Sequence, residues 1–267
     1  MTQLLLALLD RVESVPLVME AAAAAAARLG DARITALVIR HPATEGLMPT
    51  EEVAGPAVLG RRAATEEARL AAIRAAFDAW SAAGGKASFD VETGETEAVV
   101  ARRAGPGELL VIGHAPGAAR EAAQAMDVAL FSLDLPSLFV PAGASHSFGR
   151  HIAIAWKPSE AAERAIAAAR PLLLKAERVT VLMAREENVA APPDLSLLQA
   201  AGIPVDHRAF DLDGRSIGAA LLEEAHRAGA DLLVMGAYTH ARWKEFLLGG
   251  ATREILRDAD LPVLMRH

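Results

Sequence analysis

The sequence predicts an α/β protein made of two tandem doubly wound parallel sheets, each with five strands. Short apolar runs alternate with helical patterns along the chain, and this alternation starts again near residue 150. Such alternation is typical of a mostly parallel sheet covered by helices on both faces. The 267 residues also suffice for two domains of about 130 residues each. We therefore expect one domain over residues 1–142 and a second over residues 150–267.

The first half contains five apolar runs separated by helical patterns. Strands are expected at residues 3–9, 33–39, 88–92, 109–112 and 137–140, and helices at 13–29, 61–83, 96–103 and 120–130. The helix at 13–29 includes the alanine run 21–27, whose small side chains permit close packing on a sheet. In the helix at 61–83, Leu70, Ile73 and Phe77 follow spacings of three and four, which indicates one buried face.

The second half repeats this order after a small, polar linker at residues 142–148. Strands are expected at 151–156, 178–183, 205–210, 232–235 and 263–265, and helices at 159–174, 194–201, 216–228 and 249–256. Matching segments support a diverged repeat: RITALVI with RVTVLMA, ELLVIG with DLLVMG, and LPSLFVP with LPVLMRH. Thr96, Ser159 and Ser216 stand where N-caps are needed at three of the helix starts.

Composition excludes several function classes. The net charge of −7 argues against a nucleic-acid-binding protein, and the absence of cysteine excludes disulfides and thiolate chemistry. The eight histidines are scattered, so no metal site is expected. No apolar stretch reaches the ~20 residues that span a bilayer, and the apolar start lacks the basic residues of a signal peptide. We expect a cytoplasmic protein that binds neither nucleic acid nor membrane.

The last 37 residues, 231–267, contain the most informative motif. An apolar strand ends at Gly236, a polar loop carries His240, Arg242 and Lys244, and Gly249 and Gly250 open a helix. The free N–H groups and positive dipole end of a helix start favour an anion such as phosphate. The two glycines could instead allow tight packing of the helix on the sheet, and the basic loop could simply be solvated.

This stretch resembles the C-terminal signature of the universal stress proteins, in which a glycine, two residues, a glycine and nine residues precede a glycine followed by Ser or Thr. Gly236 and Gly249 match at the right spacing, whereas Thr239 replaces the second glycine and Gly250 replaces the Ser or Thr, with Thr252 two positions later. The resemblance implies an adenine nucleotide alpha hydrolase-like fold with strand order 3-2-1-4-5. The ligand crevice of such a sheet lies between strands 1 and 4.

The resemblance also implies a nucleotide site in the second domain. Its residues would be Ala155, Trp156, Lys157, Met183, Met235, Gly236, Thr239, Gly249, Gly250, Ala251 and Thr252. ATP is the cofactor implied, with Mg²⁺ only alongside ATP. Lys157 stands where the family has an Asp, and a lysine cannot accept a hydrogen bond from an adenine amino group. Trp156 is either a base-stacking residue or part of the core.

The first domain keeps a different part of the pattern. Asp10 stands where the family has its Asp, yet the loop at 113–117, GHAPG, is followed by no glycine pair. We therefore expect a degenerate site and a structural role for this domain.

The function implied by the resemblance is that of a non-enzymatic stress-response or regulatory protein. The alternatives are a ligand-free interaction scaffold and, less favoured, an ATP-using enzyme of the adenine nucleotide hydrolase type; weak ATP hydrolysis stays open. The sequence contains no P-loop, GxGxxG or GxSxG motif. Fifth strands commonly pair in this family, which implies a pseudo-dimer of the two domains within the chain, through apolar edges such as 262–265, and a homodimer of two chains.

Overall fold

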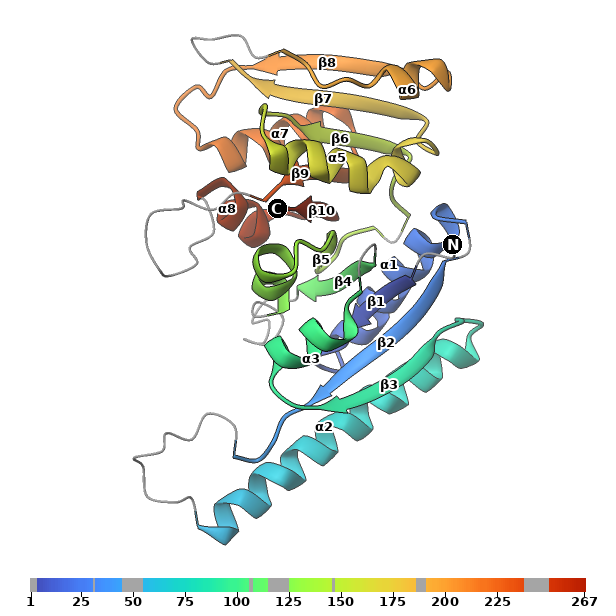
Figure 1. Ribbon diagram of the computed structural model, residues 1–267, viewed down its shortest axis with the longest axis vertical. Helices are drawn as coiled ribbons and strands as arrows, with labels where there is room; N and C mark the ends of the chain where they lie inside the picture. Colours follow the sequence, from blue (N-terminus) through green and yellow to red (C-terminus); the bar gives the residue numbers. More distant parts are fainter. Residues whose placement is uncertain are drawn as a thin grey trace.

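The protein is built on a continuous ten-stranded sheet with helices on both faces (Figure 1). A computed structural model describes residues 4–30, 32–44, 55–105, 108–114, 125–145, 147–185, 191–237 and 250–267. The strands are β1 (Leu4–Leu8), β2 (Arg33–Arg40), β3 (Ser88–Thr93), β4 (Leu109–His114), β5 (Ser137–Pro141), β6 (His151–Ala155), β7 (Arg178–Ala184), β8 (Val205–Phe210), β9 (Leu232–Gly236) and β10 (Val263–Arg266). All expected strands are present, with bounds within one or two residues of those predicted.

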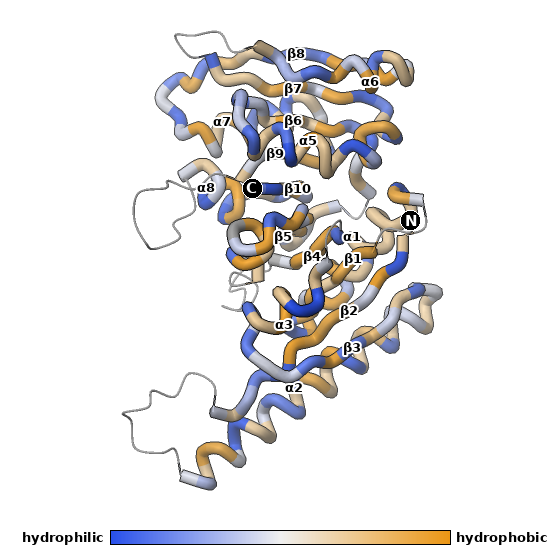
Figure 2. Tube along the Cα trace, in the orientation of Figure 1, coloured by the Kyte–Doolittle hydropathy of each residue, from blue (hydrophilic) through white to orange (hydrophobic). Residues whose placement is uncertain are grey.

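The helices form two layers, one on each side of the sheet. They are α1 (Ser14–Arg28), α2 (Pro56–Ala82), α3 (Thr96–Arg103), the π-helix η1 (Val128–Ser132), α5 (Glu160–Leu173), α6 (Ser196–Ala200), α7 (Ile217–Ala228) and α8 (Gly250–Asp258). Core residues of α1, α2 and α5 belong to one apolar cluster, and those of α3, η1, α7 and α8 to the other. Apolar residues occupy most of β1 and β2 (Figure 2), as expected for strands covered on both faces.

Two local predictions need correction. Helix α2 begins at Pro56 and not at residue 61, because proline at the first helical position has a fixed φ and needs no N–H partner. Thr96 is the first residue of α3 and gives no cap, and its buried hydroxyl has no hydrogen-bond partner among the described residues. Ser159 and Ser216 do cap their helices, as predicted. Residues 120–124 of the helix expected at 120–130 lie outside the described residues.

The two halves join through their fifth strands. The sheet order is β3-β2-β1-β4-β5-β10-β9-β6-β7-β8, so the predicted order 3-2-1-4-5 is confirmed in each half. The sequence predicted two sheets, but β5 and β10 pair antiparallel and make them one, with Leu138 opposite Leu264. Both strands have apolar edges that would otherwise be left open, and pairing them satisfies their backbone groups.

Ion pairs and shared cores reinforce this seam. Asp134, just before β5, accepts from Arg266 of β10 at 3.1 and 3.2 Å and lies 3.5 Å from Arg164 of α5. Each apolar cluster contains residues of both halves, and the fully buried Phe148 at the end of the linker belongs to one of them. The halves are therefore one packed body, so a change in one half should affect the stability of the other.

The linker is fixed at the amino end of β6. The carboxylate of Asp231, which precedes β9, accepts hydrogen bonds from the backbone N–H groups of Gly149, Arg150 and His151. From the first half, the guanidinium of Arg28 donates to the carbonyl of Gly149 at 2.8 Å. The chain therefore enters the second half through a segment attached to both halves.

His151 begins β6 in a buried position, with 9% of its surface exposed. Its Nε2 lies 2.8 Å from the Thr180 hydroxyl, and the Arg178 guanidinium lies against the ring, 3.0 Å from Nδ1. Burial lowers the pKa of His151, and the charge of Arg178 lowers this pKa further, outweighing the opposite effects of Asp231 and Asp206. The folded state therefore holds this histidine neutral at pH values where the unfolded chain would protonate it.

This difference gives a pH dependence of known sign. The ordinary pKa of histidine is 6.5, so above that pH the folded and unfolded states bind the same number of protons at this site. Below it the unfolded state binds the proton first, and the free energy of unfolding should decrease as the pH falls toward the folded-state pKa. We expect the free energy of unfolding of His151→Gln, which keeps a polar contact with Thr180, to decrease less steeply as the pH falls. Urea unfolding of the natural protein and the variant between about pH 7.5 and about pH 5 measures this pH dependence. Identical slopes of the free energy of unfolding against pH would contradict the prediction.

Candidate functional site

The candidate site lies at the carboxyl ends of β6 and β9. These strands are neighbours, with Ala155 opposite Met235 in the register. The helices that follow them lie on opposite faces, because α5 packs in one apolar cluster and α8 in the other. A doubly wound sheet opens its ligand crevice at such a point, where the winding reverses.

The residues predicted to form the site are divided between the two faces of the sheet. Ala155 and Met235 belong to the apolar cluster on the α7 and α8 side, and both are buried. Trp156 and Met183 pack in the opposite cluster, on the side of α5 and α6. Thr239 and Gly249, with the basic loop residues His240, Arg242 and Lys244, lie outside the described residues.

Trp156 has the position of a core residue. Only 9% of its surface is exposed, and its indole Nε1 donates to the carbonyl of Ala191 at 2.7 Å. The backbone N–H of Trp156 donates to Leu182 at 2.9 Å. A tryptophan that is buried and whose N–H is already bonded favours the core role over base stacking.

Gly236 allows the start of α5 to approach the end of β9. A Cβ atom at this position would lie 2.7 Å from the backbone nitrogen of Ala162 and 2.8 Å from the carbonyl carbon of Ala161. The first half repeats the arrangement, since a Cβ at Gly113 of β4 would lie 2.6 Å from Cγ2 of Val18 in α1. The glycine at the carboxyl end of β9 and the one next to the carboxyl end of β4 are therefore packing residues.

The start of α8 has a different environment. Gly250 is exposed, and a Cβ there would meet no atom of the described residues within 4 Å. Ala251 is partly buried, and Thr252 is fully buried in the first turn of the helix. Lys157, after β6, is exposed. Of the predicted residues that the structure describes, Lys157 and Gly250 are thus the two most accessible to a ligand.

A carboxylate that the sequence did not predict occupies the start of the neighbouring helix. Glu254 of α8 accepts a hydrogen bond from the Ser216 hydroxyl, and the same hydroxyl accepts one from the backbone N–H of Ala219 at 3.3 Å. A Cβ at Gly218 would lie 2.6 Å from Oε2 of Glu254. The positive end of α7 is therefore already neutralised by the protein itself. In the sequence, only the small residue Gly218 indicates that a side chain such as that of Glu254 can lie against the start of α7.

The first half fills the corresponding edge with side chains of α2. The Arg69 guanidinium donates to the backbone carbonyls of Asp10, at 2.6 Å, and Ile39, at the ends of β1 and β2. Glu66 accepts from Arg69 and from the backbone N–H of His41 at 2.9 Å. Burial alone would raise the pKa of Glu66, but the hydrogen bonds from Arg69 and His41 outweigh it and lower this pKa. A carboxylate and a guanidinium of the chain itself therefore lie across these strand ends.

The Asp10 side chain is also hydrogen-bonded to other residues of the chain. It is 6% exposed and accepts hydrogen bonds from the Ser14 hydroxyl at 2.7 Å and from Arg11 at 3.2 Å. The sequence placed Asp10 at the family position but gave no sign of Arg69, because helical periodicity does not show how far a long side chain reaches.

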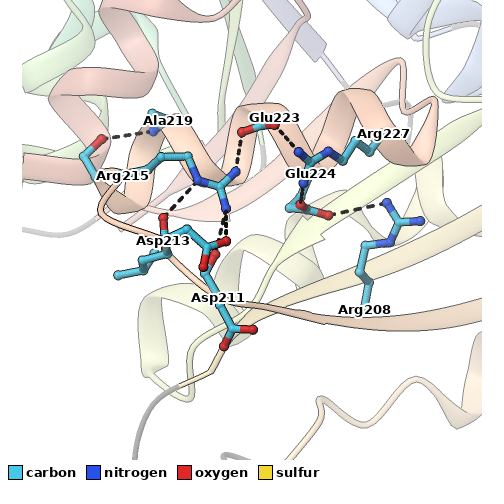
Figure 3. Close-up of polar contacts among 10 residues, drawn as sticks. Arg208, Asp211, Asp213, Arg215, Ala219, Glu223, Glu224 and Arg227 are labelled. Atoms are coloured by element: carbon cyan, nitrogen blue, oxygen red, sulfur yellow. Dashed lines mark hydrogen bonds and ion pairs between the residues drawn. The ribbon is translucent and has the colours of Figure 1, made fainter.

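A charged network covers β8 and α7 (Figure 3). Arg227 bonds to both Glu223 and Glu224, and Arg208 lies 3.5 Å from Glu224. The network is internally paired, which is typical of a solvated surface. Among the described residues, no group of three or more His, Cys, Asp or Glu is placed to hold a metal ion.

The segment DLDG at 211–214 is a turn. Asp213 and Gly214 adopt positive φ angles of 50° and 79°. Arg215 closes the turn, because its guanidinium donates to the carbonyls of Leu212 at 2.9 Å and Asp211 at 2.7 Å. The turn leads into Ser216, the cap of α7.

The strand order and the winding reversal place the chain in the class of doubly wound α/β proteins. Residues 149–267 match the model of the universal stress protein family. This match covers the second half of the chain, which follows a first half with the same strand order. No curated protein matches the sequence. No helix within the described ranges is long and apolar enough to cross a membrane.

Two solved structures share the fold over nearly the whole chain. A universal stress protein from Archaeoglobus fulgidus DSM 4304 superposes with a TM-score of 0.67 at 17% identity, covering 98% of this chain and 96% of the other. A functionally unknown protein from Pseudomonas aeruginosa PAO1 gives a TM-score of 0.54 at 13% identity, covering 98% and 92%. At these identities the similarity concerns the fold, including its tandem arrangement.

Proposed function

We propose that the protein is a non-enzymatic, cytoplasmic stress-response or regulatory protein of the universal stress protein type, and that it binds ATP, with Mg²⁺, in its second half alone. The family match at 149–267 supports the general role. The contrast between the two halves supports the location, because Arg69 and Glu66 occupy the strand ends of the first half whereas Gly250 is open.

The open start of α8 carries the proposal. The space that the described residues leave around Gly250 lets a phosphate approach the positive dipole end of α8, which favours an anion. Lys157, exposed at the end of β6, can contribute a positive charge. ATP supplies the polyphosphate that these groups would hold.

Recognition of the base has less support from the described residues. Lys157 offers no acceptor to an adenine amino group, and the Trp156 indole is bonded to Ala191. The residues present fit the phosphate end of ATP better than its base. We therefore expect Mg·ATP and Mg·GTP to bind with affinities within about tenfold of each other, since a base-specific site would need buried polar partners.

The test is a thermal shift and calorimetric titration with Mg·ATP. Ligand at about 100 times its Kd should stabilise the protein by about 2.7 kcal/mol. Gly250→Glu places a negative side chain at the start of α8 and should abolish this shift, whereas Gly250→Ala, which the open space tolerates, should keep it. Asp10→Asn, in the first half, should also leave the shift unchanged. No shift in the natural protein, or an unchanged shift in Gly250→Glu, would overturn the proposal.

A ligand-free interaction scaffold is the second candidate. The buried Thr252, the bonded indole of Trp156 and the filled first half favour it. Native mass spectrometry of freshly purified protein distinguishes the two, because co-purified nucleotide supports the first candidate and apo protein without an ATP shift supports the second. Steady ATP turnover that is lost in Gly250→Glu would instead indicate the hydrolase-type enzyme.

A further inference from the structure

Strand β8 forms one edge of the sheet, at the end opposite β3 (Figure 1). On its inner side it pairs in parallel with β7, with His207 in register with Val181. On its outer side no other strand of the described ranges lies beside it. An edge strand presents backbone N–H and C=O groups that can pair with a further strand. β8 is therefore a place where the sheet can be extended.

The hydrogen bonds to β7 show which residues of β8 face outward. The carbonyl of Pro204, just before β8, accepts from the N–H of Val179 at 2.9 Å. The carbonyl of Phe210, the last residue of β8, accepts from the N–H of Arg185 at 2.8 Å. Backbone groups alternate in direction along a strand, so the even-numbered residues of β8 face β7. The residues whose N–H and C=O groups point away from the sheet are therefore Val205, His207 and Ala209.

The side chains of β8 carry opposite charges on one face. Arg208 lies on the α7 side, because its guanidinium reaches Glu224 of α7 (Figure 3), and Asp206 shares this face since side chains alternate along a strand. Asp206 is exposed, and the Arg208 side chain is 41% exposed. Charges on an edge strand usually keep copies of a protein apart. Here an acid and a base flank the central outward residue, His207, so the pattern complements itself.

Antiparallel pairing of two β8 strands about His207 would use this pattern. A two-fold axis perpendicular to the sheet places His207 of one copy opposite His207 of the other, and the two residues exchange both backbone hydrogen bonds. Asp206 of each copy then lies opposite Arg208 of the other, in a non-hydrogen-bonded pair, where side chains approach most closely. A shift of the axis by one residue, to Asp206 or Arg208, places like charges opposite each other. The charges therefore select one register.

The present partner of Arg208 does not prevent this contact. Its guanidinium lies 3.5 Å from Glu224, and Glu224 also bonds to Arg227 of its own helix. A guanidinium has several N–H donors in a planar fork, so Arg208 can keep this contact and still donate to a second carboxylate.

The edge at β3 lacks this self-complementarity. The N–H of Gly94 donates to the carbonyl of Arg40, at the end of β2, at 3.1 Å, and alternation then makes Val91 the outward residue near the middle of β3. An antiparallel copy centred on Val91 would bring Asp90 opposite Glu92, and like charges opposite each other are destabilising. This edge is therefore unsuited to pairing with its own copy.

The fifth strands cannot supply the contact between chains. β5 and β10 are paired with each other within the sheet, so neither offers a free edge to a second chain. Of the strands that the structure describes, only β3 and β8 have one side unpaired. Extension of the sheet by a second copy therefore has to use β8.

We propose that two copies of the chain associate through antiparallel pairing of their β8 strands, centred on His207, so that their sheets become one. Val205 of each copy pairs with Ala209 of the other on either side of the axis, and Asp206 faces Arg208. The contact is isologous and closed, as two-fold dimers require. It uses one short strand from each copy, which is less than a standard interface, so the dimer is weak and depends on protein concentration.

Two single charge reversals test the pairing. Sedimentation velocity over a concentration series should show dimer formation in the natural protein. Asp206→Arg places arginines opposite each other and Arg208→Glu places carboxylates opposite each other, so each should raise the dimer Kd about tenfold or more. An equimolar mixture of the two variants restores opposite charges across the contact and should form a heterodimer. A natural protein that stays monomeric at the highest concentration, or a mixture no better than its components, overturns the proposal.

Proline substitutions at the two edges test the backbone contact independently of charge. His207→Pro removes an outward N–H and leaves the hydrogen bonds to β7 in place, so the fold should be kept and the dimer lost. Val91→Pro makes the same change at the β3 edge and should leave the dimer Kd unaltered. Thermal unfolding of both variants checks that they fold. Dimer formation that persists in a folded His207→Pro would contradict pairing through β8.

Cysteine cross-linking checks the register, and the absence of natural cysteine makes it simple. His207→Cys lies at the two-fold axis, where facing Cα atoms are about 5.5 Å apart, within reach of a disulfide. Mild oxidation should therefore give a linked dimer. Ala209→Cys, on the same face and also exposed, lies about 14 Å from its copy and should not cross-link. Equal cross-linking at the two positions would contradict this register.

Discussion

Replacing Gly236 by alanine is expected to lower the free energy of unfolding by about 3 kcal/mol, at the upper end of the usual cost of overpacking. The added Cβ would lie 2.7 Å from the nitrogen of Ala162 and 2.8 Å from the carbonyl carbon of Ala161. Both are backbone atoms at the start of α5, so no side-chain rotation can relieve the clash. Either α5 or β9 must move, and the core between them must open.

Two matched glycine substitutions separate this effect from a general intolerance of alanine. At Gly113, the corresponding position of the first half, the added Cβ would meet Cγ2 of Val18, a side-chain atom that can move. Gly113→Ala should therefore cost less than Gly236→Ala. At Gly250 the Cβ has open space, and Gly250→Ala should be neutral or slightly stabilising. Urea unfolding of the three variants ranks them, and an equal loss at 236 and 250 would contradict the explanation.

Gly236 also shows how far the sequence could predict the site. Its position after a buried strand identified the fold correctly, because the motif marks where β9 ends and the chain turns. The sequence could not tell a glycine needed for ligand approach from one needed for helix packing. The distances to α5 favour packing for Gly236, and the empty surroundings of Gly250 keep ligand approach open there.

The strands were predictable for a similar physical reason. A strand buried on both faces must be apolar throughout, so runs such as 109–112 and 232–235 were visible without any alignment. The joining of the two halves through their fifth strands was implied by the family resemblance alone, and not by composition or periodicity. It depends on the apolar edges of β5 and β10 meeting across the sheet, a contact between segments distant in the chain.

Long polar side chains were the least predictable features. Arg69 lies in a regular amphipathic helix, yet its guanidinium reaches the carbonyls at the ends of two strands. Glu254 reaches the cap of another helix in the same way. Such contacts depend on tertiary geometry, and for that reason the filling of the first half's strand ends by α2 could not be predicted from the sequence.

Asp231→Ala is expected to lower the free energy of unfolding by about 3 kcal/mol, since buried donors that lose their partner cost about 1–3 kcal/mol each and some will find water. One carboxylate oxygen accepts from Gly149 at 2.7 Å and from His151 at 3.2 Å, and the other accepts from Arg150 at 3.1 Å. Alanine leaves all three backbone donors unpaired at the entry to β6. Asp231→Asn keeps one acceptor oxygen and should lose roughly half as much.

The control for this prediction is Asp211→Ala, which removes an exposed carboxylate paired with an equally exposed arginine, Arg185. This change should leave stability almost unaltered. Because the linker is also held by Arg28 of the first half, and the apolar clusters span both halves, Asp231→Ala should shift one cooperative transition. Differential scanning calorimetry measures the number of unfolding transitions and their shift in the variant. Two separate transitions in the natural protein would mean that the halves unfold independently, and the shared cores would then contribute little to their coupling.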